Sequence, residues 1–349
     1  MCSSTFDPSA NPKPPAMARS LWFLGLWLSL WGLLCSPRNA RAEWSAIAEQ
    51  KTSYTTDAFQ FSSARRLRFS EDPSQPTVVP TDKPEDVIWE PSIEVLRSAS
   101  TSLGKNELSF KAHGAIFTNN PVFNHGDYRI QDRQWFGADT SLLLRYRYVP
   151  NLFLGPNFER RTGARLIQEE RLTSHHWRAE FERRLNDRVT AALIGRYGLR
   201  LYNEAFAERD TKFYTVGPRV AYQVASWMRL ILAYLYERGL ADGHQQIQYA
   251  DDVSYYLHMV SLEALIAVSE RLDLDLAYGH LRKTFTSGIA GDTHLGRFDQ
   301  THQGTMELRY HFTHAATALL SFQRSQRSST NVLRDFNDSI VSIGAQYRF

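Results

Sequence analysis

The amino-acid sequence predicts an all-β protein, an antiparallel up-and-down transmembrane β-barrel with 14 strands preferred. Three observations predict this class. Apolar and polar residues alternate along many segments, tight and long connections alternate between those segments, and one hairpin repeats roughly every 40 residues. Strict alternation is typical of strands with one apolar and one polar face, and connections sorted by length are typical of membrane barrels. A β-sandwich, which would bury its apolar rows against each other, is the alternative fold.

The composition excludes a nucleic-acid-binding domain and a cysteine-based scaffold. The chain has 349 residues with 40 Lys and Arg against 37 Asp and Glu, and the basic surplus lies in residues 1–42. The rest of the chain is neutral and offers no basic surface for nucleic acid. Cys2 and Cys35 are the only cysteines, which excludes a disulfide framework and a Cys-based zinc site. We expect no cofactor and no metal.

Residues 1–42 have the three parts of a secretory signal peptide. A short positive region around Arg19 precedes an apolar run of 14 residues, Leu21–Leu34, and a typical cleavage site ends at Ala42. The apolar run is shorter than the roughly 20 residues of a membrane-spanning helix. We expect cleavage after Ala42, with residues 1–16 as an extension upstream of the true start. A retained membrane anchor or a lipid anchor is the alternative.

The mature chain, residues 43–349, is expected to form one barrel domain. The clearest alternating rows lie at 189–201, 228–236, 272–278 and 306–312. Applied to the whole chain, the same pattern predicts strands at 53–62, 86–101, 107–118, 133–148, 151–160, 173–185, 188–202, 210–224, 227–238, 251–267, 271–283, 303–312, 315–324 and 338–349. If the first two segments lie outside the barrel, twelve strands remain. Both counts are even, as single-chain bacterial barrels require.

An aspartate recurs where a long connection ends and the next strand begins. The recurring residues are Asp86, Asp132, Asp210, Asp252, Asp299 and Asp338. Such a repeat supports the barrel prediction, because every strand of a closed barrel meets the same two solvents.

The alternation also assigns charged residues to the barrel interior. We expect the pore to be lined by Lys111, Arg145, Arg147, Arg196, Arg219, Arg229, Glu263, Asp273, Asp275, Glu307 and Arg309. Interior basic and acidic residues nearly balance, so the total charge predicts no strong ion selectivity. Glu263, Asp275 and Glu307 fall on three consecutive strands, and the first hypothesis is an acidic patch that faces a basic sector across the lumen. The second hypothesis is that these groups pair as ion bridges and fill the lumen.

The motifs of barrel hydrolases are incomplete in this sequence. Thr301–Thr305 contains a histidine but no serine at the required place, and no Gly-x-Ser-x-Gly elbow or Gly-rich phosphate loop is present. His175 and His176 are adjacent on a strand, so they point to opposite faces and are poorly placed to bind one metal together. We expect a protein that is not an enzyme, with a barrel hydrolase as the less favoured alternative.

The end of the chain carries a family resemblance. Tyr347-Arg348-Phe349 follows Val341, Ile343 and Ala345, which share one face of the last strand. An alternating strand closed by Phe resembles the assembly signal of Gram-negative outer-membrane β-barrels, with Tyr347 and Phe349 as its aromatic residues. The segments Thr56–Phe59 and Glu85–Ser92 look like the opening of the type-two β-barrel porins.

This resemblance implies a location in the cell outer membrane and three kinds of partner: outer-membrane lipid, the barrel-assembly machinery and a small polar solute. The function it implies is a porin-like passive channel. The alternative is a non-enzymatic structural or binding barrel, or a partner in polymer export.

Overall fold

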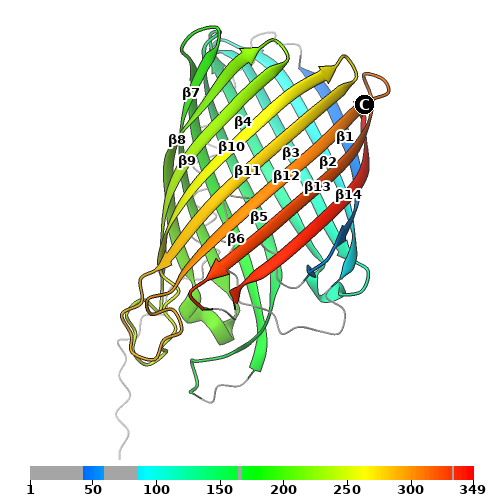
Figure 1. The fold of residues 1–349 in the computed structure, drawn as a ribbon. Coiled ribbons are helices and arrows are strands. Elements are labelled where there is room, and N and C mark those ends of the chain that lie inside the picture. The colour runs from blue at the N-terminus through cyan, green and yellow to red at the C-terminus, as the bar shows by residue number, and fades with distance from the viewer. Residues whose placement is uncertain (1–41, 59–84, 164–166, 332–333) are drawn as a thin grey trace, which may run out of the picture.

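The computed structural model describes residues 42–58, 85–163, 167–331 and 334–349, and most of them lie in β-strands. Figure 1 shows long tilted strands that surround a central space. The fourteen strands are β1 (Glu43–Thr55), β2 (Asp86–Thr101), β3 (Gly104–Phe117), β4 (His125–Phe136), β5 (Thr140–Phe158), β6 (Ile167–Arg184), β7 (Val189–Tyr202), β8 (Thr211–Ala225), β9 (Met228–Ala241), β10 (Tyr255–Ser269), β11 (Leu272–Phe285), β12 (Phe298–His311), β13 (Ala316–Ser329) and β14 (Phe336–Arg348). Two short 3-10 helices, η1 (Pro121–Phe123) and η2 (Glu204–Arg209), lie in connections. None of the described helices has the length and apolarity needed to cross a membrane.

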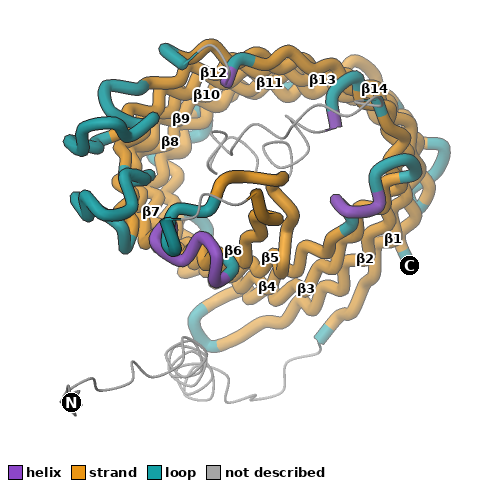
Figure 2. Tube along the Cα trace, turned by 90° about the horizontal axis from the view of Figure 1, so that it is seen from below, coloured by secondary structure: helices purple, strands orange, loops and turns teal. Residues whose placement is uncertain are grey.

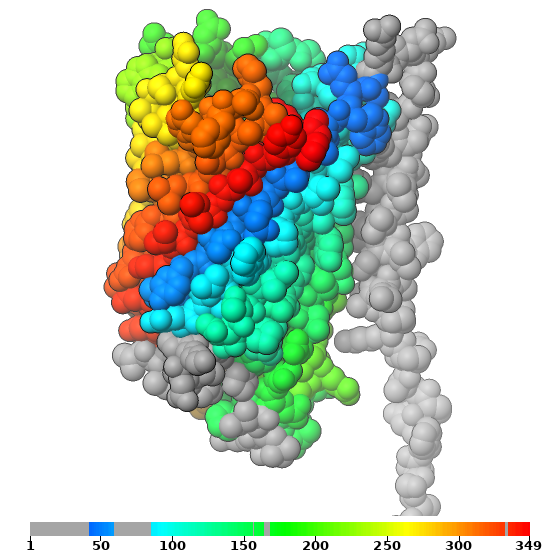
Figure 3. Space-filling view, turned by 90° about the vertical axis from the view of Figure 1, so that its right-hand side faces the viewer, coloured from blue at the N-terminus to red at the C-terminus, as the bar shows by residue number. Residues whose placement is uncertain are grey.

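The strands form one closed antiparallel barrel, as the sequence predicts. Each strand pairs with its sequence neighbours, and β14 pairs with β1. In this closing pair Ser342 lies opposite Ser53, and Val341 lies opposite Tyr54. Figure 3 shows β14 lying against β1 along the surface. Closure leaves no free strand edge in the sheet. The predicted count of 14 is therefore confirmed, and the sandwich and the twelve-stranded barrel are wrong.

The two faces of the barrel wall have opposite chemistry. Large apolar side chains point outward, among them Leu193, Leu232 and Ile343, whose exposed fractions are 58%, 53% and 67%. Charged side chains point inward, where Arg200 and Glu237 are buried. This arrangement reverses that of a soluble sandwich, and it gives the outer wall the apolar surface that lipid requires.

The connections are sorted by length between the two ends of the barrel. One end, called the turn end below, has the links 102–103, 137–139, 185–188, 226–227, 270–271 and 312–315. The other end, the loop end, carries longer connections that include 203–210, 242–254 and 286–297. Figure 2 looks into the barrel from the loop end.

The recurring aspartates anchor these longer connections. Asp86 accepts hydrogen bonds from the backbone N–H groups of residues 118–120 at 2.9–3.1 Å. Asp338 accepts one from the N–H of Asp57 at 3.0 Å, and Asp210 accepts one from the N–H of Tyr202 at 2.7 Å. Each carboxylate satisfies backbone donors at the point where the chain leaves the sheet, which explains why the residue type recurs. Asp132 differs, because it lies within β4.

The predicted position of the first strand is wrong. The strand is Glu43–Thr55 and not 53–62, and it pairs with both β2 and β14. Its outward residues include Ala46 and Ala48, whose small side chains weaken the apolar alternation on which the prediction depended.

The predicted boundary between the fourth and fifth strands is also wrong. A strand predicted over 133–148 crosses a tight turn at 137–139, where Gly137 has a φ of +72°. The turn predicted near Asn151 is a bulge inside β5, where the register shifts between Val149 and Leu152. A bulge adds a residue without ending the strand. From β6 onward the predicted and observed strand ends agree within six residues.

The expected signal peptide lies outside the described residues, apart from Ala42.

Candidate functional site

The candidate functional site is the barrel lumen, whose two ends differ. At the turn end, a cavity of about 990 Å³ extends to the rim. Strands β1, β3 and β11 to β14 contribute to its wall, which includes Lys51 and the predicted pore residues Lys111, Asp273, Glu307 and Arg309. The turn end is therefore a wide, charged mouth.

Two of the three acids predicted to form a patch near this mouth, Glu307 and Asp275, are held by neighbouring cations. Glu307 accepts hydrogen bonds from Lys51 Nζ at 3.0 Å and from Arg309 Nε at 2.8 Å. Arg309 also lies 3.5 Å from Asp275. Lys51 reaches Glu307 from β1 past β14, where a side chain at Gly344 would overlap it. These contacts favour the hypothesis of ion bridges over that of an acidic patch facing a basic sector.

Other predicted pore residues pair around the middle of the lumen. Arg147 binds both carboxylate oxygens of Asp127 at 2.7–3.0 Å, and Arg145 donates to Gln131 at 2.8 Å. The guanidinium of Arg219 contacts Glu180 and Glu182. These contacts join residues of β4, β5, β6 and β8, so this sector of the wall carries a series of ion pairs and hydrogen bonds.

The three remaining predicted residues also lie on the interior face of the wall. Arg196 of β7 is buried, and Arg229 and Glu263 lie on the neighbouring strands β9 and β10. The strand alternation thus places all eleven predicted residues on the lumen side, but on many strands and at both ends, so they do not form one compact site.

Toward the loop end the lumen narrows around a buried polar network. Tyr255 donates a hydrogen bond to Glu237 at 2.6 Å, Thr215 donates another at 2.6 Å, and Arg200 bonds the Tyr255 hydroxyl. Local sequence makes room for this network. A side chain at Gly239 would overlap the ring of Tyr255 that lies across it. Glycine is therefore needed opposite the aromatic residue.

The loops add a second charged layer above this network. Arg209 of η2 donates to Glu170 and to Asp251, each at 2.6 Å, and all three side chains are buried. Burial would lower the pKa of Arg209, but the two carboxylates hold that pKa well above its usual value. The ion pairs therefore keep the arginine charged and fix η2 against β6 and the 242–254 connection.

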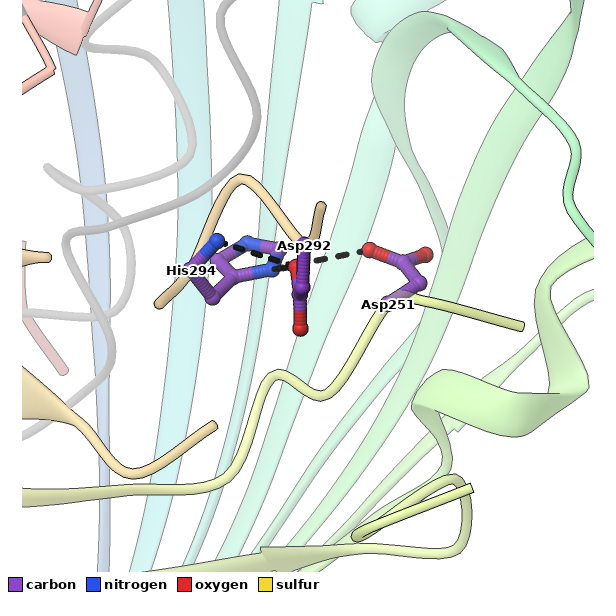
Figure 4. Close-up of side chains that lie close together, drawn as sticks. All are labelled: Asp251, Asp292 and His294. Carbon is purple, nitrogen blue, oxygen red and sulfur yellow. Dashed lines mark hydrogen bonds and ion pairs between the residues drawn. The ribbon is translucent and has the colours of Figure 1, made fainter. Parts of the chain in front are cut away.

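One group in this layer could hold a metal ion. Figure 4 shows His294 Nδ1 facing Asp292 at 2.9 Å and Asp251 at 3.6 Å. Their ligand atoms all lie within 4.8 Å of one another. Burial lowers the pKa of His294, which favours the neutral imidazole that a metal needs. Hydrogen bonds from His294 and Ser287 outweigh burial and lower the pKa of Asp292 to about 2.

The loop-end residues of the second layer were not predicted from the sequence. Arg209, Asp251, Asp292 and His294 lie in connections, where alternation says nothing about which side chains meet. The recurrence of Asp252 was one available signal, because its N–H donates to Asp292 at 2.8 Å and ties the two connections together.

The predicted assembly residues lie at the outer wall of the turn end. Tyr347 and Phe349 are 49% and 72% exposed, and their ring centroids lie 4.8 Å apart. The backbone N–H of Phe349 donates to the carbonyl of Ala46 at 2.8 Å, so the last residue takes part in closing the barrel.

No protein-family model and no curated protein sequence matches the chain. Among solved structures, the outer membrane channel DcaP of Acinetobacter baumannii has a TM-score of 0.49 at 11% identity, with 89% of this chain and 98% of that chain covered. The trimer form of OmpT, an outer membrane protein of Vibrio cholerae, has a TM-score of 0.48 at 8% identity, with 89% and 100% covered. A bacterial polysaccharide outer membrane secretin has a TM-score of 0.46 at 10% identity, with 86% and 98% covered. The chain is an all-β barrel that resembles such channels by structure only.

Proposed function

We propose that the protein is exported to the outer membrane and acts there as a porin-like passive channel for small polar solutes. One observation carries the proposal: the closed barrel combines an apolar outer wall with a charged lumen that widens to about 990 Å³ at the turn end. Lipid suits such an outer wall, and polar solutes suit such a lumen. The eleven charged residues named above are the proposed pore lining, with outer-membrane lipid and the assembly machinery as partners.

The export part of the proposal is tested by sequencing the N-terminus of the protein from purified outer membranes. We expect the sequence to begin at Glu43. A mature protein that retains Leu21–Leu34 would overturn the signal-peptide assignment.

The channel part is tested by single-channel recording in planar bilayers with purified, refolded protein. We expect stable conductance steps that scale with salt concentration. Bilayers that stay silent, with the protein shown by circular dichroism to keep its β-structure, would contradict the channel and favour the second candidate.

The second candidate is a non-enzymatic binding or structural barrel, or a partner in polymer export. It is favoured by the loop end, where buried ion pairs leave a cavity of only about 20 Å³. In this candidate the loops bind a partner, and the mouth at the turn end does not continue through the barrel.

We also propose that the protein is not an enzyme. His302 is the histidine of the incomplete hydrolase-like segment. Its Nδ1 shares a hydrogen bond of 2.7 Å with the Tyr278 hydroxyl, and both side chains lie on the outward face of the wall. His302 is therefore bonded to a tyrosine hydroxyl, and the segment 301–305 contains no serine to act as the nucleophile. Turnover of phospholipid that is lost in a His302→Ala variant would contradict this assignment.

A further inference from the structure

Four cationic side chains from four separate elements line the small cavity at the loop end. They are Arg209 of η2, Lys283 of β11, Arg297 before β12 and Arg334 before β14. Glu170 supplies the one carboxylate among the residues that line this cavity. The volume of about 20 Å³ exceeds the roughly 10–15 Å³ that one water molecule needs. The cavity can therefore hold a single small group, and the wall around it is basic.

Two of these cations already have strong carboxylate partners. Arg209 binds Glu170 and Asp251, and Arg297 binds Asp299 through two hydrogen bonds of 2.9 and 2.6 Å. The partners fix the direction of both guanidinium groups. They also hold these arginines in place, so that the cavity is lined by charges that are already ordered before any ligand arrives.

Arg334 differs from Arg209 and Arg297. Its Nη1 is buried and has no hydrogen-bond partner among the described residues. Its backbone carbonyl accepts a hydrogen bond from Arg327 Nε at 2.7 Å, which brings a further guanidinium to the same place. Burial and the nearby charges of Arg297, Arg209 and Arg327 lower the pKa of Arg334 to about 10, so the side chain stays protonated at neutral pH.

A buried cationic donor among other cations is costly unless an anion compensates it. The planar guanidinium group matches the oxygens of an oxyanion with two parallel hydrogen bonds. Tyr202 also lines the cavity with a hydroxyl group, whereas Thr211 donates its hydroxyl to the backbone carbonyl of Arg209 at 2.7 Å. The four cations on this wall favour an oxyanion, which meets charge and donors together.

We propose that the loop-end cavity is a binding site for a small inorganic oxyanion or for the anionic group of a solute, with Arg334 as the residue that binds it directly. This inference deepens the proposed channel function, because it makes anions the class of solute that the loop end admits. The site itself does not require the channel to conduct.

Isothermal titration of the folded, detergent-solubilised full chain with inorganic phosphate at low chloride tests the binding site. We expect saturable binding that is at least about tenfold weaker in Arg334→Gln. The matched control is Arg324→Gln, because Arg324 is exposed on the outer face of β13 and bonds Ser339 at 2.6 Å. We expect this control to keep the wild-type affinity.

Two results would overturn the site: no saturable phosphate binding by folded wild-type protein, or equal weakening in both variants. Reversal potentials in a KCl gradient then separate this inference from the channel. Saturable binding without conductance would keep the site and remove the channel. If the protein conducts, prefers cations, and keeps the same preference in Arg334→Gln, the channel would stand and the anion site would be overturned.

Discussion

Glu208 in η2 illustrates how burial changes a single residue at the loop end. Its side chain is 2% exposed, and neither carboxylate oxygen has a hydrogen-bond partner among the described residues. Burial raises the pKa of Glu208 to about 7 from an ordinary value of 4.5. The carboxyl group is therefore held in its protonated form well above the pH at which an exposed glutamate ionises.

This shift predicts that the η2 region loosens as pH rises. Between pH 4.5 and about 7 the folded loop keeps a proton that the unfolded loop has lost, so stability is greatest below pH 4.5 and falls up to about pH 7. Hydrogen-exchange protection of residues 203–210, measured at pH 5 and pH 8, should decrease with pH in the wild type. The decrease should be smaller in Glu208→Gln, where the Asp210 carboxyl still contributes because burial raises its pKa to about 6, and it should keep its wild-type size in the control Glu204→Gln. Equal pH dependence in all three proteins would contradict the assignment.

Gly198 illustrates how a close contact constrains one residue. It lies opposite Phe213 and His176, and a Cβ there would overlap the ring of Phe213. We expect Gly198→Ala to lower the free energy of unfolding by about 1–3 kcal/mol, since the ring must move within a packed lumen. Urea titration of refolding into lipid vesicles measures this cost.

Gly195 on the same strand is the matched control, because a Cβ there has no atom within 4 Å. Gly195→Ala should change stability by less than about 0.5 kcal/mol. Similar losses in the two variants would show that backbone flexibility of β7, and not the Phe213 contact, sets the requirement for glycine.

At the scale of the elements, strong alternation decides which strands are predictable. From β7 to β11 the outward residues are mostly apolar, and the predicted ends lie within four residues of the observed ones. The β4–β5 turn was not predicted because it contains only the three residues 137–139, and no polar stretch marks it in the sequence. The loop-end charge clusters were not predicted because contacts between connections depend on how the chain folds in three dimensions. The alternation of apolar and polar residues along a strand says nothing about these contacts.

The register of β11 predicts different responses at adjacent residues. Leu274 lies between Ile266 and Leu308 on the outward face, whereas Asp273 faces the lumen and bonds His311 at 2.9 Å. Leu274→Arg should lower the free energy of unfolding by about 2–4 kcal/mol, because a charge then meets hydrocarbon. Asp273→Arg should cost less than about 1 kcal/mol in a solvated mouth. Refolding titrations in vesicles compare them, and equal costs would contradict the register.

At the scale of the whole molecule, closure depends on the pairing of the first and last strands. The pairing of β1 with β14 runs from Thr55, which lies opposite Ile340, to Ile47, which lies opposite Arg348. Beyond this pairing, the backbone N–H of Phe349 donates to the carbonyl of Ala46. This seam joins segments that are almost 300 residues apart, so it forms only when the rest of the sheet is in place. Sequence alternation predicted closure but did not determine which residues of the first strand pair.

Deletion of Phe349 should therefore reduce barrel assembly. The residue closes the seam, and its aromatic side chain on the outer wall matches the proposed assembly signal. We expect less heat-modifiable barrel in the outer membrane and more unassembled protein in the periplasm on gels of fractionated cells. Phe312→Ser is the control, since Phe312 is 60% exposed near the same end but lies in a turn. Assembly at the wild-type level in the deletion would contradict the proposal.

The proposed function requires that small polar solutes pass through the lumen of this barrel. Swelling of liposomes that contain the purified protein, in isotonic solutions of uncharged sugars of increasing size, measures passage without any electrical driving force. We expect rapid swelling with the smallest sugar and slower swelling as the sugar grows, because large inward side chains such as Arg200 and Tyr255 occupy part of the lumen. Liposomes that do not swell with any sugar, although circular dichroism shows a folded barrel in them, would contradict this function.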